Sequence, residues 1–193
     1  MNTNMQAVYA LSICANEKQM ERIAYLHDMP AYVYACLYAH AKTWTNFEWV
    51  LEEFVRDCNN AEKGYANNLQ FSVHAVGVFL RNDGEQIYNI PVIEEKKIVR
   101  KICNAIESAK LTGDTLTCCI LALGCICDQR KLKSELEEKM IKDVLELIAN
   151  VGDYYSPAIL TKQGNSKNVV LKMIKGERLD SKEERFLLTK LEM

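Results

Sequence analysis

The chain has 193 residues, the usual length of one domain, and 49% of them are hydrophobic while 26% are charged. This composition excludes wholesale disorder, and the low counts of proline (3) and glycine (8) exclude collagen-like and proline-rich chains. The formal net charge of −2 lacks the basic excess of a dedicated nucleic-acid-binding protein. We therefore expect a single domain that spans residues 1–193.

Apolar residues recur at helical spacing along most of the chain, whereas strand signals are sparse. Pro30, Pro91 and Pro157 each stand before a helical pattern, where proline is tolerated because the first helical turn does not need its N–H group. We predict about ten helices, which makes the expected fold all-α. They cover residues 4–14, 17–28, 31–43, 46–61, 68–81, 92–110, 115–130, 135–151, 157–163 with 167–175, and 181–192.

Three of these helices have a capping box at the start, in which a Ser, Thr or Asp is followed three residues later by Glu. The two side chains satisfy free N–H groups of the first helical turn, so the pair marks a helix N-terminus. The pairs are Thr45 with Glu48, Ser134 with Glu137, and Asp180 with Glu183.

Two of the predicted helices are apolar on every side. The run Cys118–Cys127 contains ten apolar residues, too few for a membrane span of about 20, so protein must enclose it. The segment 68–81 is similar, with His74 inside it, and a buried strand is the alternative there because periodicity cannot separate the two. We prefer a helix because the neighbouring segments are helical.

The chain contains an internal repeat of a two-helix unit. The segment His74–Val78 matches Leu121–Cys125 at an offset of 47 residues, and Glu94–Lys96 matches Glu137–Lys139 at an offset of 43. Gly77 and Gly124 fall in mid-helix, where glycine costs about 1 kcal/mol relative to alanine, and a close helix crossing would justify that cost. A unit of this length resembles the HEAT and armadillo class of α-helical repeats at the level of architecture.

The resemblance implies a right-handed stack of antiparallel helix pairs, an α-solenoid, with an irregular helical bundle as the alternative. Such a stack offers a groove, and here its floor would be the second helices of the pairs, 46–61, 92–110 and 135–151. We therefore predict a non-catalytic interaction module or scaffold that binds a protein or peptide of mixed polarity. The predicted groove residues are Glu48, Glu52, Arg100, Lys101, Lys142 and Glu146.

Two enzymatic alternatives remain open. Trp49 and Glu53 lie one turn apart, and an acid beside an indole is similar to the nucleobase cleft of HEAT-like DNA alkylation glycosylases. Against this nucleic-acid or base-repair hypothesis, acidic residues crowd the same helix and would repel phosphate. A small-molecule enzyme would need a polar pocket, for which His27, Tyr34 and Tyr38 are the candidates.

Recognisable catalytic or metal-binding motifs are missing from the sequence. The cysteines of the apolar run, at 118, 119, 125 and 127, do not have the spacing of a zinc site, and neither Cys-x-x-Cys nor His-Glu-x-x-His occurs. Phosphate-binding glycine loops and nucleophile elbows are also missing. We expect no metal and no cofactor, which favours a protein that is not an enzyme.

The start of the chain bears on its compartment and partners. The stretch Met1–Cys14 contains no Lys or Arg and lacks the layout of a signal peptide, so we expect a cytoplasmic protein whose eight cysteines are free thiols. We expect neither nucleic acid nor a membrane as partner. Self-association is a further expectation, because a short solenoid has large ends to cover.

Overall fold

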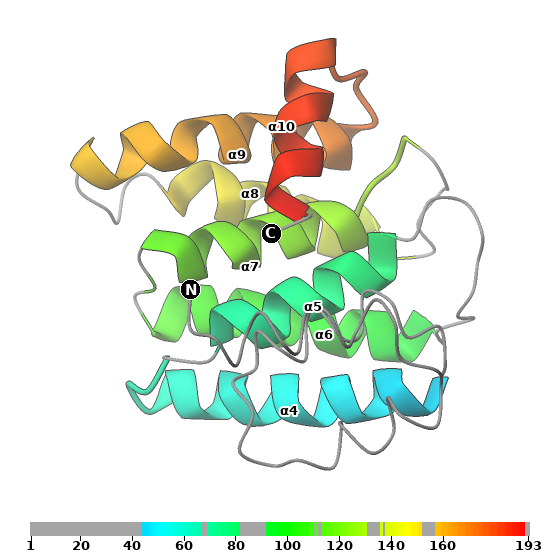
Figure 1. Cartoon of the computed structure of the whole chain (residues 1–193), viewed down its shortest axis with the longest axis vertical. Coiled ribbons are helices and arrows are strands. Elements are labelled where there is room, and N and C mark those ends of the chain that lie inside the picture. The colour runs from blue at the N-terminus through cyan, green and yellow to red at the C-terminus, as the bar shows by residue number, and fades with distance from the viewer. Residues whose placement is uncertain are drawn as a thin grey trace, which may run out of the picture.

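The computed structural model describes residues 44–66, 69–81, 92–109, 111, 113–130, 136, 138–151 and 157–191. Within these ranges the regular secondary structure consists of seven α-helices without a strand, labelled as in Figure 1. The all-α prediction is therefore confirmed for this part of the chain, while the predicted helices 4–14, 17–28 and 31–43 lie outside the described residues. The helices are α4 (Trp44–Glu62), α5 (Leu69–Arg81), α6 (Val92–Ser108), α7 (Gly113–Ile126), α8 (Glu138–Asn150), α9 (Pro157–Lys175) and α10 (Ser181–Leu191).

A capping box sets the start of α10. Asp180 caps the helix, because its Oδ1 accepts hydrogen bonds from the backbone N–H groups of Lys182 (2.8 Å) and Glu183 (2.9 Å). Glu183 Oε2 in turn accepts the N–H of Asp180 at 2.9 Å. The predicted pairing of Asp180 with Glu183 is therefore confirmed.

The other predicted helix starts have different outcomes. α9 begins at Pro157, as predicted. The cap predicted at Thr45 is wrong, because α4 already begins at Trp44. The pair Ser134 with Glu137 lies outside the described residues.

In two segments the sequence pattern did not settle the secondary structure, and the structure does. Residues 69–81 form the helix α5, so the strand alternative is wrong. Residues 157–175 form one helix instead of the two predicted pieces, and α9 passes through Gly164 without a break. Further along α9, Ser166, Val169 and Val170 are buried. Burial along the helix outweighs the weak helix propensity of the Gly-Asn-Ser stretch.

The helices pack in a regular order. α7 lies between α5 and α9 and packs against both, while α4 packs against α5 and α6, α6 against α7, and α8 against α9. Figure 1 shows α4 at one end of this arrangement and α9 with α10 at the other, with α7 between them. As its all-round apolar sequence predicted, α7 is the central helix, with nine of its residues buried.

Two glycines permit the closest crossings between these helices. A methyl group added at Gly77 of α5 would lie 3.1 Å from Ala122 Cα of α7, and one added at Gly124 of α7 would lie 2.8 Å from Val170 Cγ2 of α9. Both distances are below the 3.5–4.0 Å of an ordinary carbon–carbon contact, so neither position accepts a side chain without movement. The prediction that Gly77 and Gly124 mark close crossings is confirmed. Gly77 and Ala122 are 45 positions apart in the sequence, and Gly124 and Val170 are 46 positions apart. The two crossings therefore recur at almost the same sequence separation.

Ion pairs attach the C-terminal helix α10 to the rest of the fold. Arg130 binds Asp128 through two nitrogens, at 2.7 and 2.9 Å, and reaches Glu184 of α10 at 2.9 Å. Its side chain is only 13% exposed, so solvent screens this pair less than a surface pair. Leu187 of α10 is buried in the core. In the part of the chain described here, no helix is both long and apolar enough to cross a membrane.

Candidate functional site

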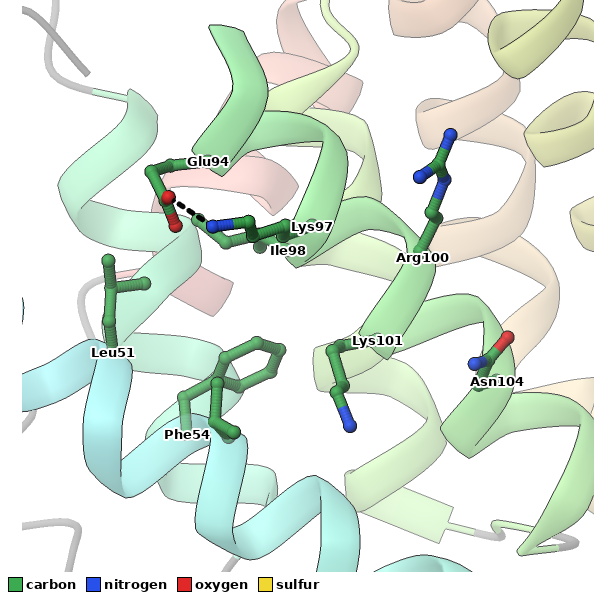
Figure 2. A pocket seen from close by; sticks show the side chains of 9 residues that line it. Leu51, Phe54, Glu94, Lys97, Ile98, Arg100, Lys101 and Asn104 are labelled. Carbon is green, nitrogen blue, oxygen red and sulfur yellow. Dashed lines mark hydrogen bonds and ion pairs between the residues drawn. The ribbon is translucent and has the colours of Figure 1, made fainter. Parts of the chain in front are cut away.

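A groove of about 350 Å³ opens between α4 and α6. It is predominantly apolar, with charged side chains along its α6 side, and Figure 2 shows how its walls are arranged. We refer to it as the α4–α6 groove. Its lining residues are Leu51, Phe54 and Val55 from α4 and Glu94, Lys97, Ile98, Arg100, Lys101 and Asn104 from α6.

The apolar wall of the groove comes from helical spacing on α4. Leu51, Phe54 and Val55 stand at positions i, i+3 and i+4, so they share one face of the helix. Phe54 is fully buried and Ile98 of α6 is almost so, whereas Val55 is 39% exposed. The wall therefore runs from the core to the surface, and Val55 is the apolar side chain most available to a partner.

The polar rim lies mostly on α6. Lys97 Nζ donates to Glu94 Oε1 at 2.5 Å, and Figure 2 shows this pair across one end of the groove. Lys101 Nζ donates to Asn59 Oδ1 of α4 at 2.6 Å, which bridges the two helices. Arg100 is exposed, and in Figure 2 its guanidinium points away from Phe54 and Leu51.

A shallower depression continues the groove along α4. It shares Leu51 and Val55 with the main groove and is otherwise lined by Glu52, Arg56 and Asn59. Arg56 forms an ion pair with Glu53, one turn earlier on the same helix. The α4 side therefore carries acidic and basic groups together, in contrast to the more basic α6 side.

The structure brings together three of the six predicted groove residues. Arg100 and Lys101 line the groove and Glu52 lines its extension. Lys142 and Glu146 lie on α8, outside this lining, where they form an exposed ion pair at 3.8 Å. Glu48 belongs to α4, but its side chain lies outside the described residues.

The residues of the nucleobase-cleft hypothesis occupy the same helix. Trp49 belongs to α4, and its side chain also lies outside the described residues. Glu53 is half-buried and its carboxylate is paired with Arg56. The pairing of Trp49 with Glu53 as a cleft stays a prediction, and the third candidate set, His27, Tyr34 and Tyr38, falls in the part of the chain that is not described.

The described cysteines are packing groups rather than reactive ones. All six carry thiols rather than disulfide bonds, and Cys58, Cys119, Cys125 and Cys127 are buried. Burial raises the pKa of Cys58 and of Cys103 to about 12 and holds the pKa of Cys119 well above its usual range. A thiol with a raised pKa is a poor nucleophile. No group of three or more metal-ligating side chains is found among the described residues.

One acidic side chain is buried behind the groove. Asp57 of α4 is only 4% exposed, and in the described part of the structure its Oδ2 has no hydrogen-bond partner. Burial raises the pKa of Asp57, and this effect outweighs the hydrogen bond from Ser72 and the charge of Arg56, which lower it. The raised pKa of Asp57 predicts that the stability of the fold depends on pH, and Asp57 lies outside the groove lining.

Comparison with known proteins gives no match to a protein-family model, to a curated protein or to a solved structure.

Sequence reasoning missed the apolar half of the site. Leu51, Phe54 and Val55 have the i, i+3, i+4 signature of a helix face, but the sequence does not show that this face is left partly uncovered beside α6. Lys97 and Asn104 were not predicted as groove residues either. One signal for the apolar wall was present in the sequence. Leu51 and Val55 stand 43 positions before Glu94 and Ile98, and 43 residues is also one of the two offsets of the internal repeat.

Proposed function

We propose that this chain is a non-catalytic protein-interaction module built as a stack of helix pairs, in the manner of HEAT and armadillo repeats. The alternation of the packing supports this arrangement, since α5, α7 and α9 follow one another in one row while their partners α4, α6 and α8 pair with them. The glycine crossings at Gly77 and Gly124 support it too, because they repeat at nearly constant spacing. Each pair needs its neighbours to bury its apolar face.

The observation that carries the functional proposal is the α4–α6 groove. It lies between α4 and α6, which correspond to two of the three helices predicted from the sequence to form the floor of a groove. Its floor is apolar and its edges are charged, which is the usual composition of a protein-binding surface. A partner that filled it would cover Val55 and the exposed stems of Lys97 and Arg100.

The nucleic-acid alternative is not proposed, because two observations weigh against it. Glu53 is engaged by Arg56, and the net charge of the chain is negative. We assign the cytoplasm as the compartment in the same proposal, on the sequence argument alone.

The test is affinity capture from a lysate of the native source with three versions of the full chain. The wild type is compared with Val55→Asp, which puts a charge on the exposed edge of the groove. The matched control is Tyr65→Asp, at an apolar side chain that is 72% exposed and lies outside the groove. Circular dichroism verifies that the three versions have equal helix content.

We expect at least one protein to be retained by the wild type and by Tyr65→Asp but lost from Val55→Asp. The same protein should bind the purified wild type directly and resist moderate salt, because apolar contact dominates. If every retained protein binds the three versions equally, the groove is not the docking site. If only nucleic acid is retained, and it is released as salt rises, the interaction-module proposal is wrong.

A further inference from the structure

The charges around the α4–α6 groove are unequally distributed. On the α6 side, Glu94 neutralises Lys97, but the acceptor of Lys101 is the uncharged amide of Asn59. Arg100 has no ion-pair partner among the described residues. Two positive charges, those of Arg100 and Lys101, therefore remain uncompensated along this wall.

The opposite wall differs. The groove residues contributed by α4, which are Leu51, Phe54 and Val55, are all apolar. Among the described side chains of α4, the carboxylate that lines the shallow extension is that of Glu52, beside Arg56. An occupant thus meets an apolar surface on one side and a cationic edge on the other.

We propose that the groove binds an amphipathic helix of a partner protein, with its apolar stripe against α4 and an acidic flank along α6. This inference rests on the proposed function and names the chemistry of the partner. A helix fits because its i, i+3, i+4 and i+7 side chains form a narrow apolar stripe that enters a groove between two helices. Carboxylates on the flank reach Arg100, whose guanidinium binds carboxylates through two nitrogens, and Lys101.

Two other partners fit the same surface less well. A nucleic acid would gain from Arg100 and Lys101, but Phe54, the only aromatic side chain among the described lining residues, is fully buried and offers no face for a base to stack on. A membrane surface is usually bound by apolar side chains that protrude, whereas the apolar residues here line a recess. The partner expected is therefore a protein segment that combines apolar and acidic side chains.

The experiment uses three designed helical peptides of about 18 residues with an identical leucine stripe and a fluorescent label. Their flanking positions carry Glu, Gln or Lys. Binding to the full chain is measured by fluorescence anisotropy at low and moderate salt. A 20-nucleotide single-stranded DNA of mixed sequence is the fourth probe.

The protein variants separate charge from fold. Arg100→Glu reverses the charge of Arg100 without breaking an ion pair between described residues. The double variant Arg100→Glu with Lys101→Glu reverses both uncompensated charges of the α6 side. The matched control reverses two exposed lysines elsewhere, Lys142 of α8 and Lys175 of α9. Val55→Asp reports whether each peptide occupies the groove.

We expect the Glu peptide to bind the wild type about tenfold more tightly than the Gln peptide, and the Lys peptide to bind most weakly. Arg100→Glu should weaken the Glu peptide severalfold, the double reversal should invert the order of the three peptides, and the Lys142/Lys175 control should leave it unchanged.

Equal binding of the three peptides, all sensitive to Val55→Asp, would overturn the acidic-helix inference but keep the groove as a docking site. If no peptide binds, or if binding ignores Val55→Asp, the inference and the proposed function both fail. Tighter binding of the DNA than of the Glu peptide, lost on double reversal, would also overturn the inference.

Discussion

Replacing Gly124 by alanine places a methyl group where α7 crosses α9. The added carbon would lie 2.8 Å from Val170 Cγ2 and 3.0 Å from Cγ1, against the 3.5–4.0 Å at which carbon atoms pack. Val170 is buried and β-branched, so its methyl groups cannot turn aside easily. Either the valine or the whole of α9 must move by several tenths of an ångström.

The expected free-energy change combines two opposing effects. Overpacking a core contact costs roughly 1–3 kcal/mol. The better helix propensity of alanine returns about 1 kcal/mol. We therefore expect Gly124→Ala to lower the free energy of unfolding by up to about 2 kcal/mol, measured by urea denaturation followed by circular dichroism.

A double-mutant cycle with Val170→Ala tests the cause of this loss. Val170→Ala alone removes two buried methyl groups and should cost about 2–3 kcal/mol. In the double variant the clashing atoms are gone and the methyl group introduced at position 124 partly fills the space, so the double variant should be more stable than the sum of the two losses predicts. We expect a coupling of about 1–2 kcal/mol, within the range measured for residues in contact.

The second crossing supplies the matched control. At Gly77 the nearest atom is the backbone Cα of Ala122 at 3.1 Å, which no side-chain truncation removes. Ala122→Gly should therefore rescue Gly77→Ala much less than Val170→Ala rescues Gly124→Ala. Additive losses in the Gly124 cycle, or a Gly124→Ala variant more stable than the wild type, would refute the close crossing and with it the structural reason for the repeat.

Three further predictions concern titratable groups. Burial raises the pKa of Asp57 in the folded protein. The contribution of its protonation to the free energy of unfolding is therefore fully present below the ordinary value of 3.8 and is lost as the pH rises through the raised pKa. Asp57→Asn should therefore stabilise the fold more at pH 7 than at pH 4 in urea denaturation, and an equal effect at both would contradict this. Asp180→Ala should lower the urea midpoint by removing the α10 cap, whereas Asp180→Asn, which keeps an acceptor oxygen, should lose less. Equal losses would show that the charge of Asp180, and not its hydrogen bonds, stabilises the helix, and no loss in Asp180→Ala would show that the cap contributes nothing. At pH 8 a thiol reagent should modify Cys58 and Cys103 slowly, since with a pKa of about 12 only about one thiol in ten thousand is ionised. Fast reaction of both would be inconsistent with their raised pKa values.

Local signals in the sequence predicted most of the described helices. The 46–61 and 68–81 predictions differ from α4 and α5 by two residues or fewer at each end. The capping box at Asp180 and the starting Pro157 act within a few residues of themselves, so they can be read from the chain alone. The continuity of α9 through Gly164 could not be read this way, because it depends on distant packing partners.

The same distinction explains the candidate site. Arg100, Lys101 and Glu52 were predicted because charged side chains on an amphipathic helix face outward wherever the helix lies. The apolar groove between them could not be predicted, since it depends on how closely α6 approaches α4 and how far Leu51 and Val55 are left uncovered. The repeat grouped Lys142 and Glu146 with these residues, but both lie on α8, whereas the described lining residues of the groove come from α4 and α6.

The claim that the α4–α6 groove is the docking surface can be tested most directly by lysine footprinting of the complex with the captured partner. The full chain, alone and bound, is acetylated briefly, and modification at each lysine is measured by mass spectrometry. We predict slower modification of Lys97 and Lys101, which line the groove, and an unchanged rate at Lys142, which is 76% exposed on α8. Protection of Lys142 with Lys97 and Lys101 unchanged would place the partner on another face and contradict the account.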